Sequence, residues 1–221
     1  MAMRTVSVIA RKGGSGKTTI SVHLALAAFL RGRRTILADM DPQRSASDAL
    51  KIRRRAGPER VESTSSKLFA QKSTAERQGF DEMIVDTQAG DMSAMATAIT
   101  LADLCVLVIR PTYLDIAAAL PAVEVIRRLR KTAVIVVNQA QSQRSGMELP
   151  AVERALRAME LFNLPICPVM VRSRAAYQTS LERGFSVEEG DDANAMAEIA
   201  ELWREIDSTA TRFVLRPVQS A

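Results

Sequence analysis

The sequence has few of the residues on which several classes of protein depend. Among its 221 residues it has one histidine and two cysteines, and only 4% are aromatic. A single histidine, His23, excludes a metal site that needs several histidine ligands. Cys105 and Cys167 lie in apolar runs without CxxC spacing. They therefore predict reduced, buried thiols of a cytosolic protein, with neither a disulfide framework nor a metal cluster.

Long apolar runs are also missing. No run of 18 apolar residues occurs, and a predicted strand follows the first few residues at once, so we expect neither a membrane span nor a signal peptide. Apolar residues still make up 47%, enough for one domain over residues 1–221 with an aliphatic and methionine core. The net charge of +5, from 30 basic and 25 acidic residues, suits a polyanionic partner such as nucleic acid.

Short apolar runs alternate with helical patterns along the whole chain. Runs such as VIVV and VLVI are apolar at every position, as in parallel strands that helices cover on both faces. The predicted strands are 6–10, 35–39, 60–63, 82–86, 104–109, 133–138 and 166–170. The predicted helices are 18–31, 46–55, 67–77, 92–101, 114–130, 149–162, 174–183 and 193–207. This order predicts an α/β fold with a doubly wound, mostly parallel sheet and helices on both faces.

The first predicted strand leads through a glycine-rich turn, ARKGGSGKTTISVH, into a helix. Gly13, Gly14 and Gly16 allow backbone N–H groups to turn inward around phosphates, where side chains would clash. The helix then begins beside Lys17 and Thr18, so that its positive end faces the anion. We expect Lys17 to reach the β- and γ-phosphates and the Thr18 hydroxyl to bind Mg²⁺.

The ordinary motif G-x-x-x-x-G-K-[ST] does not fit, because Arg11 stands where its first glycine belongs. The variant K-G-G-x-G-K-T-T does fit, and it resembles the deviant Walker A box of the ParA/MinD family, most of all its small ParA-type members. The resemblance implies a P-loop ATPase in which ATP lies between two subunits. It also implies that Lys12 reaches across to the partner's phosphates. The residues it assigns to the nucleotide are Lys12, Gly13, Gly14, Ser15, Gly16, Lys17, Thr18 and Thr19.

Three carboxylates follow from the same resemblance. The segment ADMDPQ is similar to the family's D-x-D-P-Q, which implies that Asp39 supports Mg²⁺ through water and that Asp41 positions the attacking water. In EMIVDTQAG, Asp86 ends a buried strand and is expected to hold a Mg²⁺-bound water. The family's usual D-x-P-P is replaced there by residues 86–89, DTQA, and Gly90 could supply a hinge.

Later segments extend the resemblance. VLVIRPTYLD is similar to a family strand followed by P-S/T-x-x-D, and Asn138 in VIVVNQ is a candidate for contact with the adenine base. RSRAAYQTSLERGFSV is similar to a segment near the end of small ParA proteins, where the family carries a basic surface. Helix electrostatics would favour acidic residues at the start of its helix, so Arg172 and Arg174 are predicted DNA contacts.

The family contains several kinds of protein. A redox enzyme of this family needs cysteines that bind a shared cluster, and a bacterial tyrosine kinase needs a cluster of tyrosines at its end. Neither pattern is present. A membrane-associated, MinD-like regulator of cell division remains the alternative, although the last helix carries acids opposite its apolar stripe. We expect a cytoplasmic, nucleoid-associated ATPase that partitions DNA or positions another cargo. Its ATP-bound homodimer would bind DNA nonspecifically, and a ParB-like or adaptor partner would stimulate hydrolysis.

Overall fold

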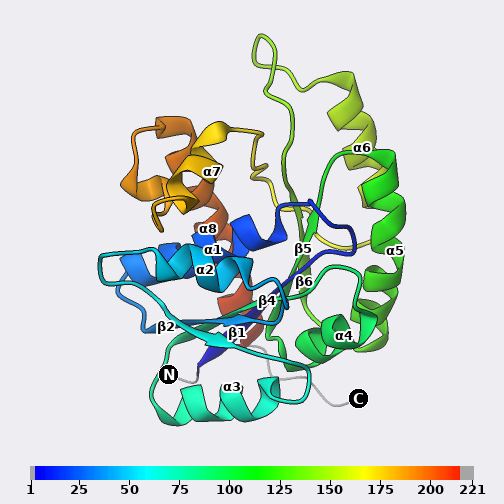
Figure 1. Ribbon diagram of the computed structural model, residues 1–221. Helices are drawn as coiled ribbons and strands as arrows, with labels where there is room; N and C mark the ends of the chain where they lie inside the picture. The colour runs from blue at the N-terminus through cyan, green and yellow to red at the C-terminus, as the bar shows by residue number, and fades with distance from the viewer. Residues whose placement is uncertain (1–2, 215–221) are drawn as a thin grey trace.

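The computed structural model describes residues 3–214, and its centre is a six-stranded sheet in which all neighbouring strands pair in parallel (Figure 1). The strand order is β3-β2-β4-β1-β5-β6. The strands are β1 (Arg4–Ile9), β2 (Thr35–Asp39), β3 (Glu59–Glu62), β4 (Glu82–Asp86), β5 (Leu104–Ile109) and β6 (Ala133–Val137). The predicted doubly wound parallel sheet is therefore confirmed.

Helices connect the strands and cover both faces of the sheet. The helices are α1 (Lys17–Leu30), α2 (Ser45–Lys51), α3 (Leu68–Arg77), α4 (Met92–Leu101), α5 (Tyr113–Arg128), α6 (Pro150–Glu160), α7 (Ala175–Leu181) and α8 (Ala193–Val214), with one 3-10 turn, η1 (Val187–Glu189). On one face α1, α2, α7 and α8 share a core with the sheet, and on the other face α3, α4, α5 and α6 do so. Figure 1 shows these two layers on either side of the strands.

Alternation along β5 explains why its sequence is apolar throughout. Leu104, Val106 and Val108 pack on the α1 face, whereas Cys105, Leu107 and Ile109 pack toward α4 and α5. Side chains of a strand point alternately to its two faces, so a strand covered on both faces needs apolar residues at every position. Both cysteines are buried thiols, as predicted.

The prediction of a seventh strand at 166–170 was wrong. This segment runs beside β6 and makes single bridges only, Ile135 to Ile166 and Ala140 to Arg172. The backbone hydrogen bonds explain the difference. Cys167 donates to the Ile135 carbonyl, but the next bond to β6 comes from Val171, which donates to the Val137 carbonyl, so residues 168–170 do not continue a ladder. The segment therefore lies beside the edge strand β6 without becoming a strand of the sheet.

Helix α8 carries the apolar stripe noted in the sequence. Ile199, Trp203 and Ile206 of that stripe are buried in the core shared with α1 and the sheet. Within residues 3–214, no helix has both the length and the apolar character needed to cross a bilayer.

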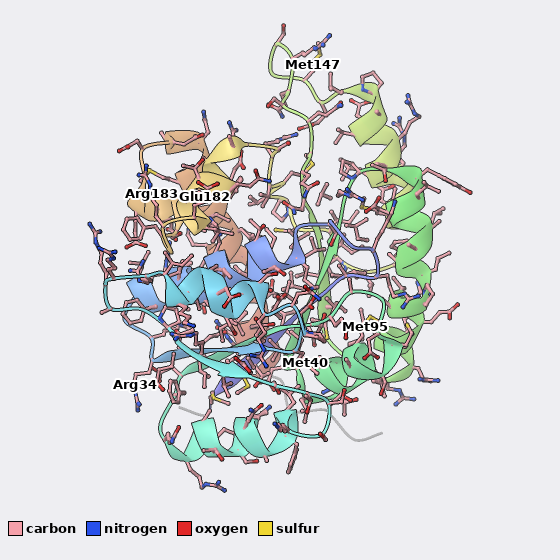
Figure 2. All side chains as sticks on the ribbon, in the orientation of Figure 1. Arg34, Met40, Met95, Met147, Glu182 and Arg183 are labelled. Carbon is pink, nitrogen blue, oxygen red and sulfur yellow. The ribbon has the colours of Figure 1, made fainter. Side chains whose placement is uncertain are left out.

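The connection from β6 to α6 projects from the body of the protein, with Met147 near its tip (Figure 2).

Candidate nucleotide-binding site

The phosphate loop connects β1 to α1 at the carboxyl ends of the central strands (Figure 1). Helix α1 begins at Lys17, and the residue before it, Gly16, has a left-handed conformation with φ of 82° and makes no side-chain cap. The first N–H groups of an α-helix have no partner inside the helix. An uncapped N-terminus behind a glycine loop is therefore suited to bind an anion such as phosphate.

Asn138 supports this loop from the end of β6. Its side-chain amide donates a hydrogen bond to the Ser15 carbonyl at 2.7 Å. A Cβ atom added to Gly16 would lie 2.1 Å from the Asn138 amide nitrogen, so this position has no room for a side chain. The structure thus places Asn138 against the phosphate loop. Its predicted contact with the adenine base stays a prediction.

Lys17, Thr18 and Asp86 meet below the loop. Asp86, at the end of β4, is fully buried and accepts hydrogen bonds from Lys17 Nζ at 3.0 Å and from Thr18 Oγ1 at 2.9 Å. Ser21 Oγ donates to the same carboxylate at 2.8 Å. Burial raises the pKa of Asp86, and the hydrogen bonds and charge of Lys17 oppose that rise. The predicted phosphate lysine, magnesium hydroxyl and magnesium carboxylate therefore lie together.

Lys12 is on the other side of the loop, away from Lys17. Its Nζ lies 3.2 Å from Asp115 Oδ2, and its side chain is 38% exposed. Asp115 itself is buried and also accepts hydrogen bonds from Arg110 and Thr112. Burial alone would raise the pKa of Asp115, but these hydrogen bonds, with that of Lys12, lower it below its ordinary value. Lys12 thus has a charged partner within its own subunit.

Asp39 and Asp41 follow β2 and have different environments. Asp39 is buried, and its two oxygens accept the backbone N–H groups of Asp41 at 3.0 Å and Ser47 at 2.8 Å. Asp41 is half-buried and accepts the Gln43 N–H at 2.9 Å. Asp39 therefore holds the loop that carries Asp41. A carboxylate oxygen has more than one acceptor site, so Asp39 can still accept a hydrogen bond from water.

Arg172 and Arg174 lie near the phosphate loop, and carboxylates hold both side chains. Arg172 donates to both oxygens of Glu148, at 2.8 and 2.5 Å, and Arg174 donates to Glu198 at 2.9 and 2.7 Å. Both arginines line a polar cavity of about 190 Å³. Its other lining residues are Thr19, Asn138, Gln139, Ser173, Tyr177 and Gln178. The prediction that the two arginines contact DNA stays a prediction.

Three further residues contact this region, and none of the sequence motifs assigns them a role. Gln139 has a positive φ of 54° and donates its amide to the Gly14 carbonyl at 3.1 Å. Arg11 donates to the Gly90 carbonyl at 3.0 Å and so links the phosphate loop to the loop after β4. Arg110 pairs with Asp115. The only sequence signal for them was their place just after predicted strands.

The donor set suits magnesium bound together with phosphate. Among the residues that the structure describes, no three His, Cys, Asp or Glu side chains converge into a site that could hold a metal alone. Mg²⁺ is usually bound through one or two carboxylates, waters and substrate phosphates. Thr18 and Asp86, which contact each other beside the phosphate loop, fit that requirement.

The chain is similar to known proteins over most of its length. Residues 6–187 match the family described as the CobQ/CobB/MinD/ParA nucleotide binding domain. The chain is 32% identical over 194 residues to the maintenance of carboxysome distribution protein A of Gloeobacter kilaueensis, covering 87% of each chain. It is 30% identical over 191 residues to protein virC1 of Rhizobium rhizogenes, covering 83% of this chain and 82% of that protein.

A solved structure supports the same fold. An ATP complex of a McdA variant from Cyanothece aligns with a TM-score of 0.74 at 13% identity and covers 99% of both chains. At that identity the likeness concerns the fold alone. The family match covers far more than half of the 221 residues and includes the phosphate loop, Asp39 and Asp86. This chain belongs to the ParA/MinD family of P-loop nucleotide-binding proteins.

Proposed function

We propose that this protein is a ParA-type ATPase that hydrolyses ATP to ADP and phosphate and positions a large cargo in the cell. One observation carries the proposal: the uncapped start of α1 follows a glycine loop, with Lys17 and Thr18 both bonded to Asp86. Every part has a known use in phosphoryl transfer, which needs positioning and charge stabilisation more than covalent chemistry.

Each residue has a distinct task in this proposal. Lys17 binds the phosphates in its own subunit, and the N–H groups at the start of α1 bind phosphate oxygens. Thr18 and Asp86 would hold Mg²⁺, with Asp39 acting through water, and the ion would neutralise charge on the phosphates. Asp41 lies on the loop that Asp39 holds, and it orients the water that attacks the terminal phosphorus.

The polar cavity beside Thr19 is the place proposed for the nucleoside. It opens next to the phosphate loop and is lined by amides, which can donate and accept hydrogen bonds, and by arginines, which can donate them. Asn138 and Gln139 lie between this cavity and the loop, so they would contact both parts of the nucleotide.

The cargo-positioning role rests on the relatives. The name of one relative refers to carboxysome distribution, and the names of others refer to replication and chromosome partitioning. In this proposal the ATP-bound homodimer, joined through Lys12, binds DNA nonspecifically. A partner protein stimulates ATP hydrolysis, which releases the protein from DNA. The protein therefore alternates between the cytoplasm and the nucleoid. The MinD-like membrane alternative is less favoured because Ile199, Trp203 and Ile206 of α8 pack against the sheet.

Calorimetry with ATP and with ADP, together with phosphate release, tests the proposal on two variants. Lys17→Ala should lower the ATP affinity by about 100-fold or more, because the phosphates lose their cation within the subunit. Asp41→Ala should bind ATP as the parent does but release phosphate far more slowly.

The two variants must fail at different steps. Lys51→Ala, in which an exposed lysine at the end of α2 is removed, is the matched control for Lys17→Ala. Unchanged ATP affinity in Lys17→Ala would contradict the nucleotide site. A normal rate of phosphate release in Asp41→Ala would contradict only the role of Asp41.

A further inference from the structure

Arg110 is a cation beside the phosphate loop whose guanidinium is only partly used. Its Nε and Nη2 donate to the two oxygens of Asp115 at 2.8 and 3.2 Å, and its side chain is 26% exposed. Within residues 3–214, its remaining nitrogen, Nη1, has no hydrogen-bond partner. A guanidinium that a carboxylate holds through two of its nitrogens can still donate from the third to a second anion.

The free nitrogen lies against the phosphate loop. Strand β5 pairs with β1, so the residue after β5 comes to lie beside the loop that follows β1. A Cβ atom added to Gly14 would be 3.8 Å from Arg110 Nη1. Gly14 is exposed and has a positive φ of 75°, so it presents bare backbone on this side of the loop. The approach to Nη1 is therefore not blocked by a side chain at that position.

Asp115 holds Arg110 and Lys12 at the same time. Lys12 Nζ lies 3.2 Å from one oxygen of Asp115, while Arg110 and Thr112 also bind that carboxylate. Lys12 can leave for another anion without leaving a buried charge unpaired, because Arg110 stays on Asp115. The arrangement thus presents two cations side by side on one exposed edge of the loop, with a single carboxylate between them.

We propose that Arg110 is a second phosphate-contacting residue at the subunit interface and acts with Lys12 on the triphosphate held by a second copy of this chain. Asp115 is then the positioning residue for both cations. This inference rests on the proposed function, since it needs an ATP-dependent dimer. It goes further by assigning a phosphate contact to Arg110 Nη1, the nitrogen that Asp115 does not use.

Two measurements on Arg110→Gln test the inference. Sedimentation with a slowly hydrolysed ATP analogue gives the dimer dissociation constant, and calorimetry gives the ADP affinity of the monomer. The dimer should weaken by about tenfold or more, as expected for a lost charge-assisted bond, while ADP affinity should stay within about twofold. Arg110→Lys should lie between the two. Arg128→Gln, an exposed arginine at the end of α5, is the matched control.

A double variant separates phosphate contact from mere support of Asp115. If Arg110 only neutralises that carboxylate, Arg110→Gln should have no further effect once Asp115→Asn is present. If Arg110 contacts phosphate, the double variant should dimerise more weakly than Asp115→Asn alone. Parent-like dimerisation of Arg110→Gln, or equality of the double variant and Asp115→Asn, would overturn the inference alone. A parent chain that never dimerises with the ATP analogue would overturn the dimer itself.

Discussion

Ion pairs that include a buried carboxylate lie at both ends of the central sheet, and they are built in different ways. At the amino ends, Arg4 and Arg33 each contact both Glu82 and Asp207, at 2.5 to 2.8 Å. Two cations and two carboxylates thus form a closed set, which Trp203 covers with its ring 5.6 and 5.3 Å from the two guanidinium carbons.

At the carboxyl ends of the strands, the cations lie beside a site where they can bind a further anion. Lys17 bonds Asp86 but lies at the uncapped start of α1, and Lys12 shares Asp115 with Arg110. A closed set of charges fixes α8 and two strands together, whereas a set beside an open anion site can exchange a carboxylate for a phosphate. In this protein, therefore, the ion pairs of the candidate site are distinguished by free donors beside them, the uncapped start of α1 and Arg110 Nη1.

The largest effect on stability should come from the closed set. Glu82 is fully buried, and burial raises its pKa against the opposing charges of Arg4 and Arg33. Glu82→Gln would leave two arginines with Asp207 alone, and we expect the free energy of unfolding to fall by about 3–5 kcal/mol. Urea unfolding measures it. Glu201→Gln, on the surface of α8, should change stability by less than about 0.5 kcal/mol. Equal losses in the two variants would remove the contrast between the two ends.

His23 tests what happens to a buried titratable group with no counter-charge. It is fully buried between Thr19, Tyr177 and Ser180, and burial lowers its pKa to about 4. Because the folded state binds the proton less well than the unfolded state, stability is present above pH 6.5 and is lost as the pH falls toward 4. The loss should reach about 3 kcal/mol.

The comparison variant for this pH effect is His23→Gln. The difference in unfolding free energy between parent and variant should change between pH 7 and pH 4, since other titrating groups are common to both. A difference that stays constant over this range would show that His23 is not the group responsible.

In contrast to Glu82, Lys12 should matter little for stability and strongly for ATP-dependent dimerisation. Lys12→Ala removes a half-exposed partner from Asp115, which keeps Arg110, so the unfolding free energy should change by less than about 1 kcal/mol. ADP binding should persist, but light scattering with a slowly hydrolysed ATP analogue should detect only monomers. A parent-like dimer peak would show that Lys12 belongs with the structural ion pairs.

We expect the smallest of these effects, a change in DNA affinity, when Arg172 and Arg174 are replaced. They lie near the phosphate loop, yet they are paired with Glu148 and Glu198 much as the amino-end arginines are paired. If they contact DNA, replacing both with Ala should weaken binding to unrelated sequences equally. The salt dependence should also shrink by about 0.9 per lost phosphate contact. Titration of the ATP-bound dimer at several salt concentrations measures both, with Arg154→Ala, the removal of an exposed arginine on α6, as the control. If the salt dependence of DNA binding did not change, the two arginines would be structural residues that do not contact DNA.

Much of the fold could be predicted because the relevant signals are local. Six of seven predicted strands were confirmed, since apolar runs and turn residues lie within a few positions of each other. The failure at 166–170 was not visible in the apolar pattern, because that segment bonds β6 only at Cys167 and again at Val171, and the pattern does not specify backbone pairing. The three nucleotide segments stood out because each depends on short spacing after a strand.

The sequence by itself determined the phosphate loop, the helix behind it and the strand ends that carry Asp39 and Asp86, because glycine, lysine and aspartate spacing acts through the local backbone. The partners that the charged side chains take depend instead on the tertiary fold. Lys12 and Asp115 are 103 residues apart, and Asn138 reaches the loop across 123 residues. Such pairs depend on strand order, since β5 lies next to β1 and β6 lies next to β5, and the segments after these two strands carry Asp115 and Asn138 to the loop.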